Sequence, residues 1–312
     1  MNFQTVTGPV AVAQVALADA HAHAWIAPPA GVLPENRYEL SDFEAIRAEL
    51  NDFRSAGASL LVDCQPGGCG RDAGRLRELA QVTGVHITAT TGFHLRKYYP
   101  PESWLWSASA EEAAAYFIEE LTIGIAEAGR AAAATTIKVA YSGAIEGQTR
   151  ALMEAAAEAC RRTGALLLFH TERGANIEAL VPFFGDRGIP AHRLYLCHVD
   201  KRPDLSLHRE LAQAGVLLGY DTFARPQYNP ERGVWPLLLK MVAEGLTGQV
   251  ALGLDLAAAS QWRHYGGGIG LEFLPRNVVA RLHAEGLPAA VIHQLTAVNI
   301  ASRLVAAAEV KE

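Results

Sequence analysis

Several features that would define the class of this protein are missing from its sequence. The 312 residues contain no run of Lys or Arg and carry a formal net charge of −6, so nothing favours binding to nucleic acid or to an anionic membrane. No apolar stretch approaches the ~20 residues of a membrane-spanning helix. The N-terminal segment also lacks the positively charged start of a signal peptide. We therefore expect a small-molecule partner.

The four cysteines have no recognisable arrangement. Cys64, Cys69, Cys160 and Cys197 form neither a C-x-x-C pair nor a spacing typical of disulfide frameworks. Free thiols in a reducing compartment, the cytoplasm, are the expectation. No predicted strand is followed by G-x-G-x-x-G or G-x-x-x-x-G-K-[ST], which counts against nucleotide-binding α/β folds.

What the sequence does contain is a regular alternation of short β-rich runs with Ala-, Leu- and Glu-rich stretches of helical period. This alternation predicts an α/β fold of parallel strands joined by crossover helices. Strands are expected at 15–20, 59–63, 86–91, 136–139, 165–170, 194–198, 216–220 and 250–255. Eight is the strand number of a (β/α)8 TIM barrel, and one such domain would use residues 1–312.

The predicted helices lie between these strands. They cover 41–56, 73–82, 110–128, 149–162, 175–184, 206–213, 230–243 and 274–285, and a closing helix covers 289–308. Ser41 is the expected N-cap of the first helix, because Glu44 follows it at the capping-box position.

Polar residues stand at the ends of several predicted strands. In a (β/α)8 barrel the loops that follow the strands converge on one face, where the active sites of this architecture lie. His21 and His23 end the first strand as H-x-H, and period-2 alternation points both imidazoles to the same face. Taken alone, this pair fits ordinary hydrogen-bonded histidines equally well. The other residues that end apolar runs are Lys138, His170, His198 and Asp255.

These residue types together indicate a metal site. Burying the charge of Lys138 or Asp255 at the mouth of a packed barrel costs several kcal/mol unless the group is paired or bound to a metal. Imidazole and carboxylate ligands suit zinc, manganese, iron or cobalt, and an open coordination position lets a bound water ionise near neutral pH. The site is therefore expected to be catalytic rather than structural.

The order of these residues resembles the phosphotriesterase family, a branch of the amidohydrolase superfamily. The likeness lies in H-x-H on the first strand, Lys on the fourth, His on the fifth and sixth, and Asp on the eighth. The segments VDCQPGGCGRD (62–72), TGF (91–93) and YYP (98–100) are also similar to that family's second and third strand regions. The resemblance covers nearly the whole chain and implies an amidohydrolase-type barrel that forms a homodimer.

The resemblance also implies a cofactor and a mechanism. Two divalent ions, zinc first and manganese, cobalt or iron as alternatives, would be bridged by a carboxylated Lys138. His21, His23 and Asp255 would hold the more buried ion, and His170 and His198 the more exposed one. A hydroxide bridging the two ions would attack the substrate, and Asp255 would be the catalytic residue that accepts its proton.

The loops around the metal site have to determine which class of substrate binds. Lys97 and Tyr98, Lys201 and Arg202, and Arg225 follow the third, sixth and seventh strands, where their charges suit an anionic substrate, although ordinary solvated loop charge explains them equally well. This loop set resembles that of phosphotriesterase-like lactonases that open sugar lactones, some of them phosphorylated. We therefore expect a binuclear metal-dependent lactonase.

The long loop 256–270 after the eighth strand is predicted to be mobile. Its Trp262 and Tyr265 are further candidates for contact with the substrate, although such aromatic residues more often anchor a loop.

Other functions share the same metal core. An organophosphate triesterase or a carboxylesterase would use the same residues on a different substrate. A non-catalytic binding protein of this fold is a remoter alternative, because such a protein would be expected to lack one of the six ligands, and all six are present.

Overall fold

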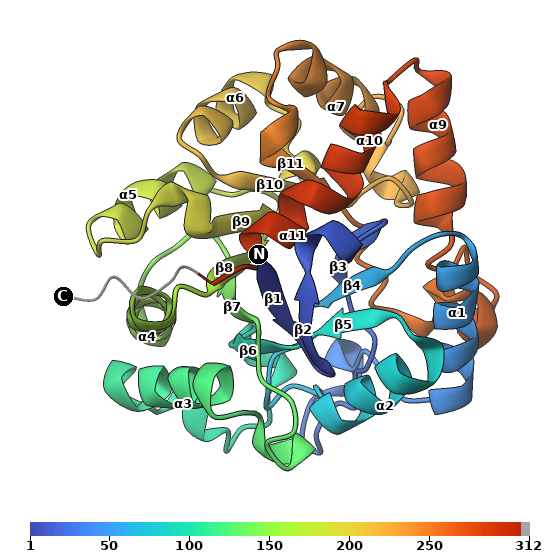
Figure 1. The fold of residues 1–312 in the computed structure, drawn as a ribbon. Helices are drawn as coiled ribbons and strands as arrows, with labels where there is room; N and C mark the ends of the chain where they lie inside the picture. Colours follow the sequence, from blue (N-terminus) through green and yellow to red (C-terminus); the bar gives the residue numbers. More distant parts are fainter. Residues whose placement is uncertain (307–312) are drawn as a thin grey trace.

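Parallel strands lie at the centre of the molecule and helices surround them, as Figure 1 shows for residues 1–306, the part of the chain that this computed structural model describes. The central strands are β3 (Ala18–Ala22), β4 (Leu60–Asp63), β5 (His86–Thr88), β6 (Thr90–Gly92), β7 (Thr136–Tyr141), β8 (Leu166–Thr171), β9 (Leu194–Cys197), β10 (Leu217–Tyr220) and β11 (Val250–Leu252). β5 and β6 are two halves of one barrel strand, because β5 pairs with β4 and β6 pairs with β7 on either side of Ala89. The predicted (β/α)8 barrel is confirmed.

A carboxylate joins the first and last strands of the barrel. Parallel ladders connect β3 to β5 and β6 to β11. Between β11 and β3, Oδ1 of Asp19 accepts the N–H groups of His21 (3.0 Å) and Leu254 (3.2 Å). The N–H of Asp255 donates to the carbonyl oxygen of His21 at 2.9 Å. Two residues at the barrel mouth, His21 and Asp255, are thus tied directly to each other.

The helices follow the strands as the alternation predicts. They are α1 (Phe43–Ser55), α2 (Ala73–Thr83), α3 (Ala110–Thr122), α4 (Gly147–Thr163), α5 (Leu180–Gly185), α6 (Leu205–Gln213), α7 (Val234–Ala243), α8 (Arg263–Gly266), α9 (Val279–Ala284), α10 (Ala289–His293) and α11 (Asn299–Arg303). π-helical segments at Leu274–Val278 and Gln294–Val298 precede α9 and α11. Within residues 1–306, no helix has both the length and the apolar character needed to cross a membrane.

Some helix ends differ from the prediction. α1 is capped by Asp42, whose carboxylate accepts the N–H of Ala45 at 3.0 Å, so the prediction of Ser41 as the cap is wrong. α3 ends at Thr122, before the predicted end at 128. Residues 307 and 308 of the predicted closing helix lie outside the described residues.

Apolar side chains alternate between two layers of core. Leu166 and Leu168 point into the barrel, whereas Leu167 and Phe169 pack against the surrounding helices. An N-terminal hairpin that the sequence analysis did not predict, β1 (Asn2–Thr5) and β2 (Gly8–Ala11), adds Phe3 and Val10 to the inner layer. Figure 1 shows this hairpin lying across the centre of the barrel.

Candidate active site

A bulge in β3 turns the first two histidines into the barrel mouth. Ala18 and Ala20 belong to the inner core, so strict alternation would turn His21 and His23 towards the helices. The register with β4 shifts between Asp19 and Ala22. Such a bulge re-aims the side chains that follow it. Both imidazoles consequently face the mouth and are buried.

Two other strand-end residues adopt a left-handed backbone conformation. Cys197 points into the inner core, so alternation would turn the next residue outward, but His198 has a φ of 64° and its ring lies at the mouth instead. Asp255 has a φ of 52°. Residues other than glycine are uncommon in this region, and such strain gathers at functional sites.

Lys138 is fully buried on β7, and its charge adds to the effect of burial in lowering the pKa values of His21, His170 and His198. Gly92 on β6 lies opposite it with a φ of 96°, and a Cβ there would collide with the Lys138 backbone, so this position requires glycine. Nζ of Lys138 has no hydrogen-bond partner within the described residues. A buried amine without a partner is costly, which indicates that a group outside the polypeptide completes this site.

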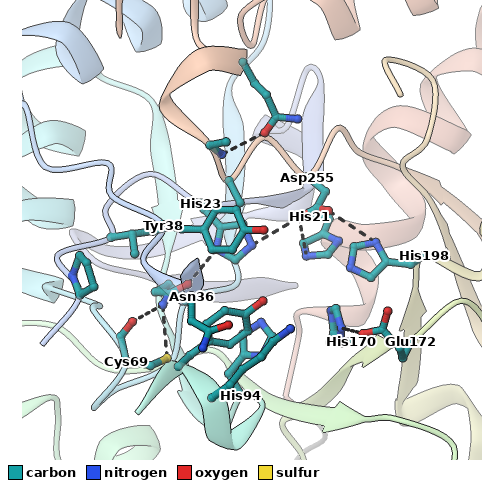
Figure 2. Close-up of a pocket in the computed structure, with 18 of the residues that line it drawn as sticks. His21, His23, Asn36, Tyr38, Cys69, His94, His170, Glu172, His198 and Asp255 are labelled. Carbon is teal, nitrogen blue, oxygen red and sulfur yellow. Dashed lines mark hydrogen bonds and ion pairs between the residues drawn. The ribbon is translucent and has the colours of Figure 1, made fainter. Parts of the chain in front are cut away.

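Five of the six predicted ligands, all except Lys138, line one pocket (Figure 2). Nε2 of His21 and Nε2 of His23 lie 3.7 and 3.5 Å from Oδ1 of Asp255, and the three residues form a cluster able to hold a metal ion. The His198 ring lies 4.6 Å from that of His21 and 4.9 Å from that of His170, between ring centroids. Nε2 of His21 is buried without a partner in residues 1–306.

Hydrogen bonds on the outer side of each ring hold the histidines in place. The two carboxylate oxygens of Asp221 each lie 2.9 Å from an Nδ1, one of His21 and one of His198. Oε1 of Gln65 lies 3.0 Å from Nδ1 of His23. Metal-binding histidines are characteristically oriented by such partners. Asp221 therefore orients two rings, although it also lies close enough to them to be counted as a ligand.

Burial sets the charges of the ligand groups. It lowers the pKa values of His21 and His198 well below the ordinary value, so both rings are neutral and able to bind a metal. Burial acts to raise the pKa of the Asp255 carboxyl group, but the neighbouring His198, His21 and Arg225 side chains favour its ionised form and hold the pKa well below its ordinary value.

The pocket beside these ligands has a volume of about 520 Å³ and a cationic rim. Four of the predicted substrate-binding residues line it: Lys97, Tyr98, Lys201 and Arg225. Nζ of Lys97 lies 5.1 Å from the ring centre of Tyr98, and Nζ of Lys201 lies 5.4 Å from that of Tyr228. Nη2 of Arg225 donates to Oδ2 of Asp255 at 2.6 Å. Among the cations of this lining, Lys97 and Lys201 form no ion pair within residues 1–306, although the Glu172 carboxylate lies in the same lining.

Three predicted substrate-binding residues do not line the pocket, and their side chains make other contacts. Arg202 donates to the carbonyl oxygen of Gly174 and to Glu178, both at 3.2 Å. Trp262 is fully buried, and its Nε1 donates to the carbonyl oxygen of Leu256 at 2.8 Å. The hydroxyl oxygen of Tyr265 accepts the N–H groups of Ser41 and Asp42, each at 3.2 Å.

The loop 256–270, which the sequence predicts to be mobile, is attached to α1 by hydrogen bonds. Glu49 is fully buried on α1, and its carboxylate accepts the N–H groups of His264 (3.1 Å) and Leu271 (2.7 Å). Nε2 of His264 lies 2.7 Å from Oδ2 of Asp52. These bonds hold the loop from outside the pocket and give its aromatic residues a structural role.

Replacing Tyr265 by Phe is therefore expected to lower the free energy of unfolding by about 1 kcal/mol, the usual contribution of a hydrogen bond. KM and kcat should stay within about twofold of the wild-type values, since the hydroxyl group faces α1. Urea unfolding together with steady-state kinetics measures both quantities. A large rise in KM with unchanged stability would indicate that Tyr265 contacts the substrate.

Four imidazoles and an aspartate lie at the mouth of a closed (β/α)8 barrel, next to a buried lysine that has no hydrogen-bond partner in residues 1–306. This combination defines a metal-dependent hydrolase of the TIM-barrel class. The model of the phosphotriesterase family matches residues 1–303, and the chain belongs to that family.

Individual relatives share about a quarter of their aligned residues with this chain. The chain is 26% identical over 277 residues to a phospho-furanose lactonase of Mycoplasmopsis synoviae, covering 84% of this chain and 78% of the relative. It is 26% identical over 272 residues to the N-acetyltaurine hydrolase of Bos taurus, covering 81% and 75%. The crystal structure of a lactonase from Listeria monocytogenes has a TM-score of 0.91 and 22% identity over 99% of this chain and 100% of that chain.

Proposed function

We propose that this protein is a lactonase that opens a polar lactone bearing an anionic group, such as a phosphorylated sugar lactone. The proposal rests on one observation: the ligand cluster lines the same cavity as Lys97 and Lys201. An ammonium group is a compact charge that binds phosphate well. The resemblance to a phospho-furanose lactonase supports the same substrate class.

The residues fit two divalent ions, with zinc proposed first. His21, His23 and Asp255 would hold one ion, and His170 and His198 the other. Lys138 would bridge them as a carbamate, formed when its uncharged amine adds to carbon dioxide and loses a proton. Its unpartnered Nζ supports this modification. When bound, such ions supply a water that ionises near neutral pH and a Lewis acid for the carbonyl oxygen.

The side chains of the protein then have distinct tasks. The Asp255 carboxylate accepts the proton of the attacking water, and the Arg225 guanidinium fixes that carboxylate through Oδ2. Asp221 orients the rings of His21 and His198. Lys97 and Lys201 hold the anionic end of the substrate and so place its carbonyl carbon over the ligand cluster.

The same site suits a second reaction, hydrolysis of a small anionic N-acyl compound. The cationic rim would bind its acidic end, and a relative that is an N-acetyltaurine hydrolase favours this candidate. A neutral organophosphate triester would make no use of either lysine. The proposal therefore ranks lactones first, anionic amides second, and neutral triesters and simple carboxylic esters last.

Replacing Lys201 by Met is expected to raise KM for a phosphorylated lactone about tenfold, which corresponds to ~1.4 kcal/mol of lost binding. KM for the same lactone without phosphate should change little. Kinetics of metal-loaded enzyme on paired lactones, anionic N-acyl amides and a neutral triester measure this. Lys240→Met on α7, outside the pocket lining, is the matched control. Faster turnover of the triester than of any lactone would contradict the proposal.

A further inference from the structure

His94 faces the pocket but has no task in the mechanism above. It follows β6, is only 8% exposed, and lines the cavity. Its ring centre lies 5.0 Å from that of His170 and 4.6 Å from that of Tyr98. Figure 2 shows His94 across the pocket from Asp255. A polar ring in this position is placed to contact a bound substrate.

The backbone fixes which nitrogen of His94 carries the hydrogen. The N–H of Leu95 donates to Nδ1 of His94 at 2.7 Å, so Nδ1 needs a free lone pair and the hydrogen of the neutral ring is on Nε2. The N–H of His94 itself donates to the hydroxyl oxygen of Tyr99 at 2.9 Å, which holds the segment in place. No hydrogen bond is formed by Nε2 within the described part of the chain, and the His94 residue lines the cavity.

From this geometry we infer that His94 is a catalytic residue whose Nε2–H donates a hydrogen bond to the carbonyl oxygen of the substrate. The inference rests on the proposed acyl hydrolysis. As water attacks the carbonyl carbon, the carbonyl π pair moves onto oxygen, and a fixed donor stabilises the negative charge that develops there. Asp255, on the other side of the pocket, takes the proton of the water.

The same geometry argues against His94 as the acid that protonates the leaving oxygen. A ring whose Nδ1 accepts a hydrogen bond is neutral, and it could give up its Nε2 proton only by becoming an imidazolate anion. Neutral imidazole is far too weak an acid for that transfer, but it remains a good hydrogen-bond donor. His94 therefore stabilises charge without changing its own protonation state.

The experiment compares His94→Phe with His94→Gln in metal-loaded enzyme. Phe fills the space without a donor, whereas the Gln amide places an N–H near the position of Nε2. We expect His94→Phe to lower kcat about 10²-fold, the usual effect of losing one such donor. His94→Gln should recover most of this loss. KM, metal content and melting temperature should change little in both variants.

A series of substrates with leaving groups of increasing basicity tests the role directly. A donor to the carbonyl oxygen predicts the same loss across the series. A loss that grows with leaving-group basicity would identify a general acid and overturn the inference, as would unchanged kcat in His94→Phe. Loss of metal in parallel with activity would instead make His94 a ligand and also overturn it.

The role of His94 and the identity of the substrate are tested independently. The variants are compared on whichever acyl substrate, lactone, ester or amide, the wild-type enzyme hydrolyses. A wild type that prefers amides would overturn the lactonase proposal and leave the His94 comparison intact. A wild type without activity on any acyl substrate would overturn both. If His94→Phe does not fold, His94→Asn, which lacks a donor at Nε2, replaces it.

Discussion

Replacing Asp255 by Asn is expected to lower kcat by about 10³-fold, within the ~10²–10⁴-fold range of acid–base catalysis, while the barrel stays folded. The amide has nearly the same shape as the carboxylate but cannot accept the proton of the attacking water. It also removes the negative charge beside His21, His23 and Arg225. Kinetics at saturating metal, with metal content determined in the same samples, measure the effect.

Two controls make the Asp255 result specific. Asp52→Asn removes an acidic group that lies outside the pocket and pairs with His264, so its activity should equal that of the wild type. Circular dichroism of Asp255→Asn should match the wild-type spectrum. Near-normal turnover in Asp255→Asn with two ions bound would remove Asp255 from the mechanism.

Replacing Lys138 by Met is expected to abolish binding of the metal pair and to lower activity by at least ~10³-fold, since two-metal chemistry needs both ions. The metal-free variant should be at least as stable as the metal-free wild type. Met fills a similar space but carries no amine to bury without a partner, and such burial is costly. Elemental analysis and melting temperatures of both metal-free proteins measure the two effects.

The modification of Lys138 has its own readout. Wild-type protein loaded with metal in labelled bicarbonate should show a carbamate carbon signal by NMR, and Lys138→Met should not. Retention of two ions per chain by Lys138→Met would show that the lysine does not bridge them.

The fold was predictable because the alternation of strands and helices is regular over most of the chain. Four of the six proposed ligand positions were predictable for a related reason: His21, His23, His170 and His198 are polar residues at or next to the end of an apolar strand. Lys138 lies inside β7, and Asp255 lies three residues after the end of β11. Asp221 satisfies the same rule, because it directly follows Tyr220 at the end of β10. Applying the rule to that strand as well would have found the carboxylate that orients His21 and His198.

The remaining features depend on tertiary geometry. Nothing in the local sequence shows that a buried Glu49 on α1 accepts the N–H groups of His264 and Leu271. Trp262 and Tyr265, in the same loop, lie outside the pocket lining. Strict alternation would also have turned His198 towards the helices, because its position at the mouth requires a left-handed φ. Gln65 orients His23 from a glycine-rich loop whose path has no simple periodicity.

The extra residue in β3 decides which face of the strand the H-x-H motif occupies. Deleting Ala20 would let β3 pair evenly with β4, and in the shorter strand strict alternation would still point both imidazoles to the barrel mouth. A strand of the present length that paired evenly with β4 would instead turn both imidazoles into the helix layer. The direction of these side chains therefore depends on the residue count of β3, which makes chain length there a heritable part of the active site.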